Sequence, residues 1–287
     1  MAAVEHDTQR FHDPSPVAMR RVVSAITTPN WSCSSDQLRP MADQARRLGI
    51  RLHSHLSETH DYVRWAREVH HCTPLQFVAE HEWVGEDVWF AHMVHLDDGD
   101  LQICAETKTG IAHCPQSNAR LGSGIARIPE ALALGIPVGL AVDGAASNEA
   151  ADMASEAHAA WLVHRADPRA GARGVQAGGL AHAMTVEDVV HIGTAGGARM
   201  MGLQGVGTLQ VGMAADLCVY DLDQPRHFGL FDPAIGPVAS GGRPTMRLAL
   251  VQGRVVVEND AIRGLDMAQL RRDALAFVKA VRRWPMA

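Results

Sequence analysis

Histidine and carboxylate residues recur at short spacings in apolar segments of this chain. The first such segment reads HSHLSE and carries His53, His55 and Glu58. In an extended strand, side chains two residues apart point to the same face, so His53 and His55 would lie together. Imidazole nitrogens and carboxylate oxygens are ligands that zinc and iron accept in proteins. The segment therefore raises the question of a metal site.

Polar residues also follow the later strand-like segments. His92 lies in DVWFAHMVHL, HCPQSN carries His113, Ser117 and Asn118, and Asp143 follows in LAVDG. In parallel α/β barrels, the carboxyl ends of the strands build the active site. Histidines and an aspartate that converge at such an edge predict a divalent-metal site.

The elements that must position these residues alternate between strand-like and helix-like patterns up to about residue 203. Such alternation favours parallel βαβ units and the α/β class. A Gly/Ala-rich loop is expected over residues 167–182. The predicted strands cover residues 19–29, 50–58, 87–96, 109–118 and 136–144, and the predicted helices cover residues 34–49, 59–70, 73–84, 97–108, 125–135, 148–166 and 185–202.

The pattern changes after residue 203, where strand-rich segments replace the alternation. Gln252 and Gly253 separate the apolar runs LALV and RVVV, which indicates a β-hairpin. An amphipathic helix is predicted to close the chain. These changes predict a barrel domain at 1–203, a small β-domain at 204–262 and a C-terminal helix at 263–287.

Taken together, HSHLSE, FAHMV, HCPQSN and VDGAASNEAADM resemble the metal-dependent amidohydrolase superfamily. The likeness is to its deaminases of aromatic heterocycles, such as those acting on cytosine and 8-oxoguanine. GVGTLQVGMAADLCVYDLD resembles the entry into the C-terminal β-domain of that family. Further segments, including AHCPQSNARL and FGLFDPAIGPVASGGRP, are most similar to the pterin-ring deaminases that act on isoxanthopterin.

The resemblance implies a TIM-like (β/α)8 metal-dependent hydrolase barrel, of which this chain carries about strands 4–8, followed by the small β-domain. It also implies a role for each of the polar residues. The metal ligands would be His55, His92 and Asp143, the catalytic residues Glu58, His92 and Asp143, and the substrate-binding residues His113, Ser117 and Asn118.

The resemblance also implies a first-strand HxH pair of metal ligands, which His53 and His55 do not supply. Asp143 follows His55 by only 88 residues, whereas a first-strand pair would precede that aspartate by well over about 200 residues in a barrel of about 250. His6 and His12 lie in a polar stretch and form no such pair. The chain is therefore interpreted as the C-terminal two-thirds of a deaminase, and its fourth barrel strand is expected to form an open edge.

The activity implied by the resemblance is hydrolytic deamination of an amino-substituted heterocycle, with release of ammonia. The substrate would be a pterin such as isoxanthopterin or a purine such as 8-oxoguanine, and the metal would be zinc, with iron as the alternative. Two other readings stay open. One is a hydrolase of chloro- or amino-triazines, and the other is an inactive fragment of such an enzyme.

Charge, hydropathy and cysteine pattern argue against several other classes of protein. The net charge of −6 argues against a nucleic-acid partner. No run of about 18 apolar residues is present, so no membrane span is expected, and the polar N-terminus does not resemble a secretory signal. The five scattered cysteines form no CxxC, which predicts a reducing, cytoplasmic location. A small-molecule heterocycle is the expected partner, and the resemblance implies a homo-oligomer.

Overall fold

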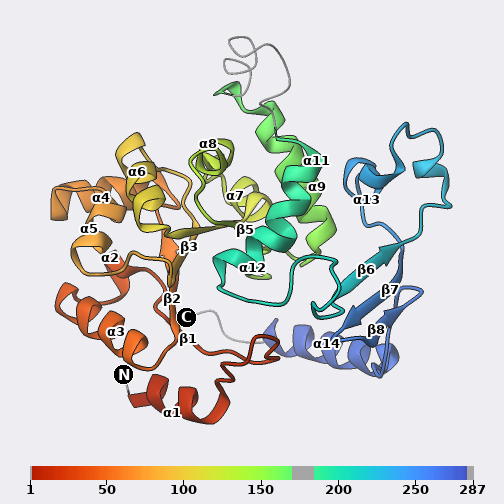
Figure 1. The fold of residues 1–287 in the computed structure, drawn as a ribbon, viewed down its shortest axis with the longest axis horizontal. Coiled ribbons are helices and arrows are strands. Elements are labelled where there is room, and N and C mark those ends of the chain that lie inside the picture. The colour runs from red at the N-terminus through yellow and green to blue at the C-terminus, as the bar shows by residue number, and fades with distance from the viewer. Residues whose placement is uncertain (1, 170–183, 283–287) are drawn as a thin grey trace. The chain divides into compact units, whose positions relative to one another are not determined.

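A five-stranded parallel sheet forms the centre of the larger unit (Figure 1). The computed structural model describes residues 2–169 and 184–282. The strands lie in chain order, and each pairs with the next in parallel. This arrangement confirms the predicted α/β class, and each predicted strand segment contains one of the observed strands. They are β1 (Val23–Ala25), β2 (Arg51–Leu56), β3 (Val88–His92), β4 (Gly110–His113) and β5 (Val138–Leu140).

Helices precede the sheet and connect its consecutive strands. Up to β5 they are α1 (Ala2–Phe11), α2 (Pro29–Ser32), α3 (Ser35–Arg47), α4 (His60–His70), α5 (Pro74–Glu80), α6 (Asp98–Thr107), α7 (Pro115–Leu121) and α8 (Ile128–Ala133). After β5 come α9 (Met153–Ala166), α11 (Val186–His191), the π-helical turn η2 (Ile192–Gly196), α12 (Gly197–Met200), the 3-10 turns η3 (Pro225–His227) and η4 (Pro233–Ile235), and α13 (Gly236–Ala239). In the part of the chain that the structure describes, no helix is long and apolar enough to cross a bilayer.

The main hydrophobic core lies on the face of the sheet that the connecting helices cover. Residues in β2 alternate between buried and half-buried, as expected for a strand with one face in the core. Leu52 and Leu56 are fully buried on the core side, where Phe90 and Ile111 from the neighbouring strands join them. Burial of each such side chain contributes about 1.5–3 kcal/mol. The alternation leaves His53 and His55 on the opposite face.

A smaller apolar cluster occupies that opposite face and consists of Trp89, Ala112 and Met200. Met200 reaches the sheet from α12 because two strand positions lack a side chain. A Cβ atom added at Gly110 would lie 2.6 Å from Met200, and one added at Gly139 would lie 2.8 Å from it. Glycine at these positions therefore allows the close approach of α12.

One predicted strand is shorter than expected. The segment 109–118 was predicted to be extended throughout, but β4 ends at His113 and α7 begins at Pro115. Proline at the first position of a helix loses no hydrogen bond and already has a helical φ. His113 therefore ends the strand, whereas Ser117 and Asn118 lie on the helix. The predicted loop at 167–182 falls mostly on residues 170–183, outside the described residues.

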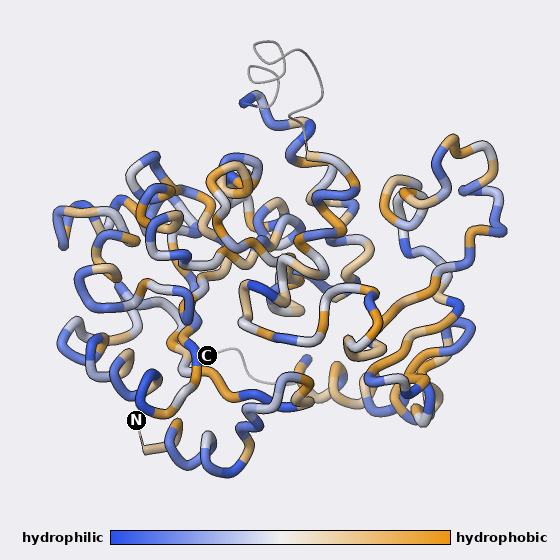
Figure 2. The backbone as a smooth tube through the Cα atoms, in the orientation of Figure 1, coloured by the Kyte–Doolittle hydropathy of each residue, from blue (hydrophilic) through white to orange (hydrophobic). Residues whose placement is uncertain are grey.

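The smaller unit comprises, of the described residues, 215–221 and 245–282, and contains an antiparallel sheet. Its elements are β6 (Leu217–Tyr220), β7 (Met246–Val251), β8 (Arg254–Glu258), β9 (Ala261–Ile262) and α14 (Met267–Val281). Hydrophobic residues run along β6, β7 and β8 (Figure 2). The predicted hairpin is confirmed, because Gln252 and Gly253 join β7 to β8 with the positive φ values that a type I′ turn requires. The domain boundaries predicted at residues 203 and 262 stay a prediction.

Candidate metal centre

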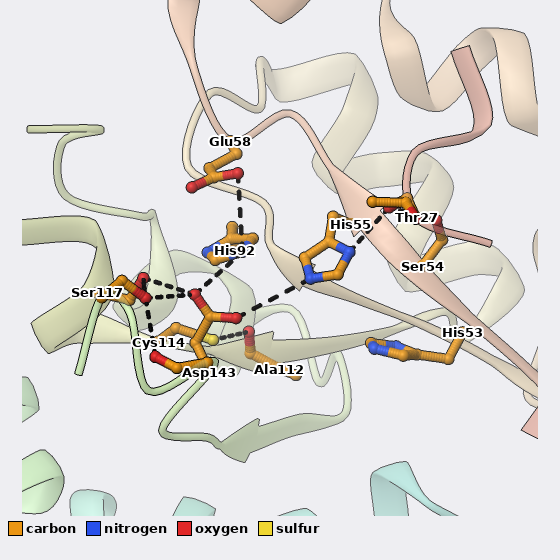
Figure 3. Close-up of polar contacts among 12 residues, drawn as sticks. Thr27, His53, Ser54, His55, Glu58, His92, Ala112, Cys114, Ser117 and Asp143 are labelled. Carbon is orange, nitrogen blue, oxygen red and sulfur yellow. Dashed lines mark hydrogen bonds and ion pairs between the residues drawn. The ribbon is translucent and has the colours of Figure 1, made fainter. Parts of the chain in front are cut away.

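Three side chains meet beyond the carboxyl ends of the parallel strands (Figure 3). They are His55 in β2, His92 at the end of β3, and Asp143 in the segment after β5. Each offers one ligand atom, and the three atoms lie within 4.8 Å of one another. The Nε2 atoms of His55 and His92 each lie 3.9 Å from a different oxygen of Asp143. The structure thus brings together the three residues predicted to ligate metal.

Unusual backbone conformations direct two of these side chains into the cluster. His92 pairs in register with Leu56, so a regular strand would point it into the helix-covered core beside that leucine. Instead, His92 has a φ of 71° and Asp143 a φ of 61°, values in the left-handed region that non-glycine residues seldom adopt. Residues held in this region concentrate at functional sites.

Hydrogen bonds set both imidazoles in the tautomer that a metal requires. The Nδ1–H of His55 donates to the carbonyl of Thr27 at 2.8 Å, and the Nδ1–H of His92 donates to Oδ1 of Asn118 at 2.9 Å. With the proton on Nδ1, Nε2 keeps a free lone pair that faces Asp143. Such partners commonly orient histidine ligands and raise their basicity.

Two serine hydroxyls orient the carboxylate of Asp143. The Oγ atoms of Ser117 and Ser147 lie 2.6 Å and 3.0 Å from the same oxygen, Oδ2. Burial alone would raise the pKa of Asp143, but the hydrogen bonds from Ser117 and Ser147 contribute to a net lowering of it. Asp143 is therefore an anion at neutral pH, as a metal ligand must be.

Glu58 borders the cluster without joining the three possible ligands. Its Oε2 lies 3.8 Å from Nε2 of His92, and 26% of its side chain is exposed. Ser57, directly before it, has a φ of 49° and begins the connection between β2 and α4. The carboxyl group can therefore reach a small molecule at the cluster and still exchange protons with solvent.

The donor set fits zinc. Two imidazole nitrogens and one carboxylate oxygen are a common set of three protein ligands, with the fourth position left for water or substrate. Ligand atoms about 2.1 Å from a tetrahedral zinc lie about 3.4 Å from one another. The 3.9 Å separations between the histidines and Asp143 therefore need to contract by about half an ångström, which rotation of the partly exposed His55 and Asp143 side chains permits.

The three residues predicted to bind substrate lie close to this cluster, and each already has a contact within the protein. Ser117 contacts Asp143 and Asn118 contacts His92. His113 is 1% exposed, and its Nε2 lies 3.0 Å from Nε2 of His164 on α9. His113 and Asn118 also line a cavity of about 250 Å³, together with Pro115, Ala119, Gly122, Gly124, Ile125 and Val163. Direct substrate binding by the three residues stays a prediction.

His53 lies on the same face as His55 and is not among the clustered ligands. Its ring stacks on Trp89 with 5.1 Å between the ring centroids, and its Nδ1–H donates to the Trp89 carbonyl at 3.2 Å. Burial lowers the pKa of His53, so this imidazole is neutral. The residue packs beside the centre, and the predicted set of metal ligands does not include it.

The sequence reasoning gave no role at the site to two groups that the structure places there. The carbonyl of Thr27 orients His55, and the hydroxyl of Ser147 contacts Asp143. A backbone carbonyl carries no sequence signal. Ser147 did have one, because it follows Asp143 within a single turn in VDGAASN, where a serine commonly bonds to a nearby carboxylate or backbone group.

Comparison with known proteins identifies relatives that cover nearly the whole of this chain. The chain is 50% identical over 287 residues to isoxanthopterin deaminase from an unknown prokaryotic organism, a match that covers 99% of this chain and 60% of that protein. The crystal structure of an amidohydrolase from a Sargasso Sea environmental sample is 47% identical with a TM-score of 0.84, covering 98% and 59% of the two chains.

A variant of atrazine chlorohydrolase from Arthrobacter aurescens TC1, in complex with zinc and atraton, is 28% identical with a TM-score of 0.86. That match covers 96% of this chain and 60% of the other. The chain thus spans about three-fifths of the length of the relatives it matches. The sequence pattern of the amidohydrolase family matches residues 6–256 of this chain. The chain belongs to the amidohydrolase family.

Proposed function

We propose that this chain carries the metal-dependent active site of a hydrolytic deaminase that releases ammonia from an amino-substituted heterocycle. The observation that carries the proposal is the convergence of the ligand atoms of His55, His92 and Asp143 within 4.8 Å, with Glu58 3.8 Å from His92. A metal-ligand set beside a partly exposed carboxylate supports hydrolysis with proton transfer.

A divalent metal is the implied cofactor, and the identity of zinc rests on the donor set and on the zinc complex of the triazine hydrolase relative. Iron remains the alternative, because it accepts the same nitrogen and oxygen ligands. Zinc held by these three residues would act as a Lewis acid that lowers the pKa of a water molecule towards neutrality.

The remaining steps belong to side chains of this chain. Asp143 accepts a proton from the attacking water as its oxygen bonds to the ring carbon that carries the amino group. Glu58 delivers its proton to the adjacent ring nitrogen, takes the second proton of the attacking oxygen as the carbonyl forms, and passes it to the amine, whose bond to carbon breaks as ammonia leaves with the electron pair. The proton held by Asp143 then returns through solvent to Glu58. His92, whose Nδ1–H is held by Asn118, would act through Nε2 on the metal that polarises the attacking oxygen.

The proposed substrate class is a pterin ring that carries an amino group, such as isoxanthopterin. The support is the 50% identity to isoxanthopterin deaminase. A purine such as 8-oxoguanine carries the same amino-amidine group and is the nearest competing substrate.

A triazine hydrolase is the second candidate function. It is favoured by the 28% identical atrazine chlorohydrolase relative, because the same attack on a ring carbon can expel chloride as well as an amine. The third reading, a fragment without activity, stays open because the relatives are longer than this chain.

A substrate panel distinguishes these candidates. Zinc-loaded protein is incubated separately with isoxanthopterin, 8-oxoguanine and a chlorotriazine, and released ammonia and chloride are measured. We expect ammonia from isoxanthopterin with the highest kcat/KM and no chloride above background. Chloride release at a rate equal to or greater than ammonia release would favour the triazine hydrolase, and no product from any substrate would favour the inactive fragment.

Location and assembly stay predictions. The five cysteines are all free in the structure, which supports a reducing compartment such as the cytoplasm. A homo-oligomer is proposed from family resemblance.

A further inference from the structure

A fully buried carboxylate lies near the metal centre without contacting any of the proposed ligands. Glu156 is in the first turn of α9, and its exposed fraction is 0%. The proposed chemistry does not use it. Because burial of an uncompensated carboxylate is costly, its hydrogen-bond partners indicate what it stabilises.

Three N–H groups donate to Glu156. Its Oε1 accepts from the backbone N–H of Gln116 at 3.0 Å, and its Oε2 accepts from Nε2 of Gln116 at 2.6 Å. The same Oε2 accepts from Nδ2 of Asn148 at 2.8 Å. Burial raises the pKa of Glu156, and these hydrogen bonds oppose that shift.

The partners of Glu156 are sequence neighbours of the residues that orient the proposed ligands. Gln116 directly precedes Ser117, which contacts Asp143, and Asn118, which contacts His92. Asn148 directly follows Ser147, the second hydroxyl on Asp143. One carboxylate therefore ties together the start of α7 and the segment after Asp143.

We propose that Glu156 is the positioning residue of the metal centre, holding the two segments that orient Asp143 and His92 without itself touching metal or substrate. The inference rests on the proposed function. Two acceptor oxygens and a full side-chain length are both needed, because the three donors come from two different segments. Loss of either property would let Ser117, Asn118 and Ser147 shift relative to the ligands.

The substitution Glu156→Gln tests this role. Glutamine keeps the length but places an amide NH2 where one oxygen was, so at least one of the three donors meets another donor. We expect the zinc dissociation constant, measured by competition with a chromophoric chelator, to increase by about 10–100-fold, the usual range for loss of a group that orients metal ligands. In assays of ammonia release, kcat should fall by a larger factor than the factor by which KM changes.

Asp100→Asn is the matched control. Asp100 lies in the first turn of α6, is 1% exposed, and accepts a hydrogen bond from Thr73, which precedes α5. It is not one of the residues that orient the proposed ligands. It should lose thermal stability to a similar degree but keep the zinc dissociation constant within about twofold. Equal zinc affinity in wild type and Glu156→Gln, or an equal loss in both variants, would overturn the inference.

Hydrogen exchange in the metal-free protein separates this inference from the proposed function. Amides of residues 116–118 and 143–148 should exchange faster in Glu156→Gln than in wild type, while those of β1 and β2 stay unchanged. If the wild type takes up no zinc, the proposed function fails, and exchange alone decides: faster exchange keeps the positioning role, and unchanged exchange overturns it. If Glu156→Gln does not fold, Asn148→Ala removes one donor only and should show the same changes at smaller size.

Discussion

Replacement of Asp143 with asparagine is expected to weaken zinc binding by more than about 100-fold and to abolish ammonia release. Loss of a group that merely orients a ligand costs about 10–100-fold in affinity, so loss of an anionic ligand should exceed that range. Asparagine is chosen because it keeps the volume of aspartate and tolerates the left-handed φ of 61° at this position. Zinc affinity and ammonia release are measured on the same preparations.

Asp260→Asn serves as the control for this substitution. Asp260 is also an aspartate in the left-handed region, with a φ of 60°, and lies between β8 and β9 in the smaller unit. It should leave zinc affinity and turnover unchanged. Retention of full zinc affinity in Asp143→Asn would remove Asp143 from the proposed ligands.

Replacement of Glu58 with glutamine should leave zinc affinity within about twofold of wild type and lower kcat by about 100- to 10,000-fold. General acid–base groups contribute rate accelerations of this size, and glutamine cannot transfer protons. Zinc affinity is retained because Glu58 lies 3.8 Å from His92 and is outside the set of three clustered ligands. The readouts are steady-state ammonia release and zinc titration.

Glu68→Gln is the matched control, since Glu68 lies on the solvent side of α4 with 67% of its side chain exposed. It should behave as wild type in both assays. If Glu58→Gln kept wild-type turnover on isoxanthopterin, another group would have to carry the protons. If it lost zinc as well as activity, Glu58 would belong with the ligands.

Much of the fold could be predicted from the sequence, because local patterns determine the elements. Alternation of strand-like and helix-like segments predicted all five parallel strands, and Gln252-Gly253 predicted the hairpin between β7 and β8. The helix at Pro115 was missed, since HCPQSN follows an apolar run without helical periodicity. Pro115 at the start of α7 was the available signal, and the packing of α7 against α9 accompanies it in the structure.

The proposed ligands were predicted from their residue types and from family resemblance, whereas the conformations that unite them were not. His92 and Asp143 enter the site through left-handed backbone conformations, and no local propensity predicts these for histidine. Glu156 was missed because a single glutamate in a helix is usually exposed to solvent. Its partner Gln116 lies 40 residues away in the sequence, so only the three-dimensional structure reveals the pair.

The central claim is that His55, His92 and Asp143 of this chain form a zinc site. The most direct test is the zinc content per chain after equilibrium dialysis, compared between the wild type and His55→Ala, a substitution at a side chain that is 34% exposed and so perturbs folding little. The account predicts about one tightly held zinc per wild-type chain and essentially none in the variant. Equal zinc contents in the two proteins, whether both near zero or both near one, would contradict it.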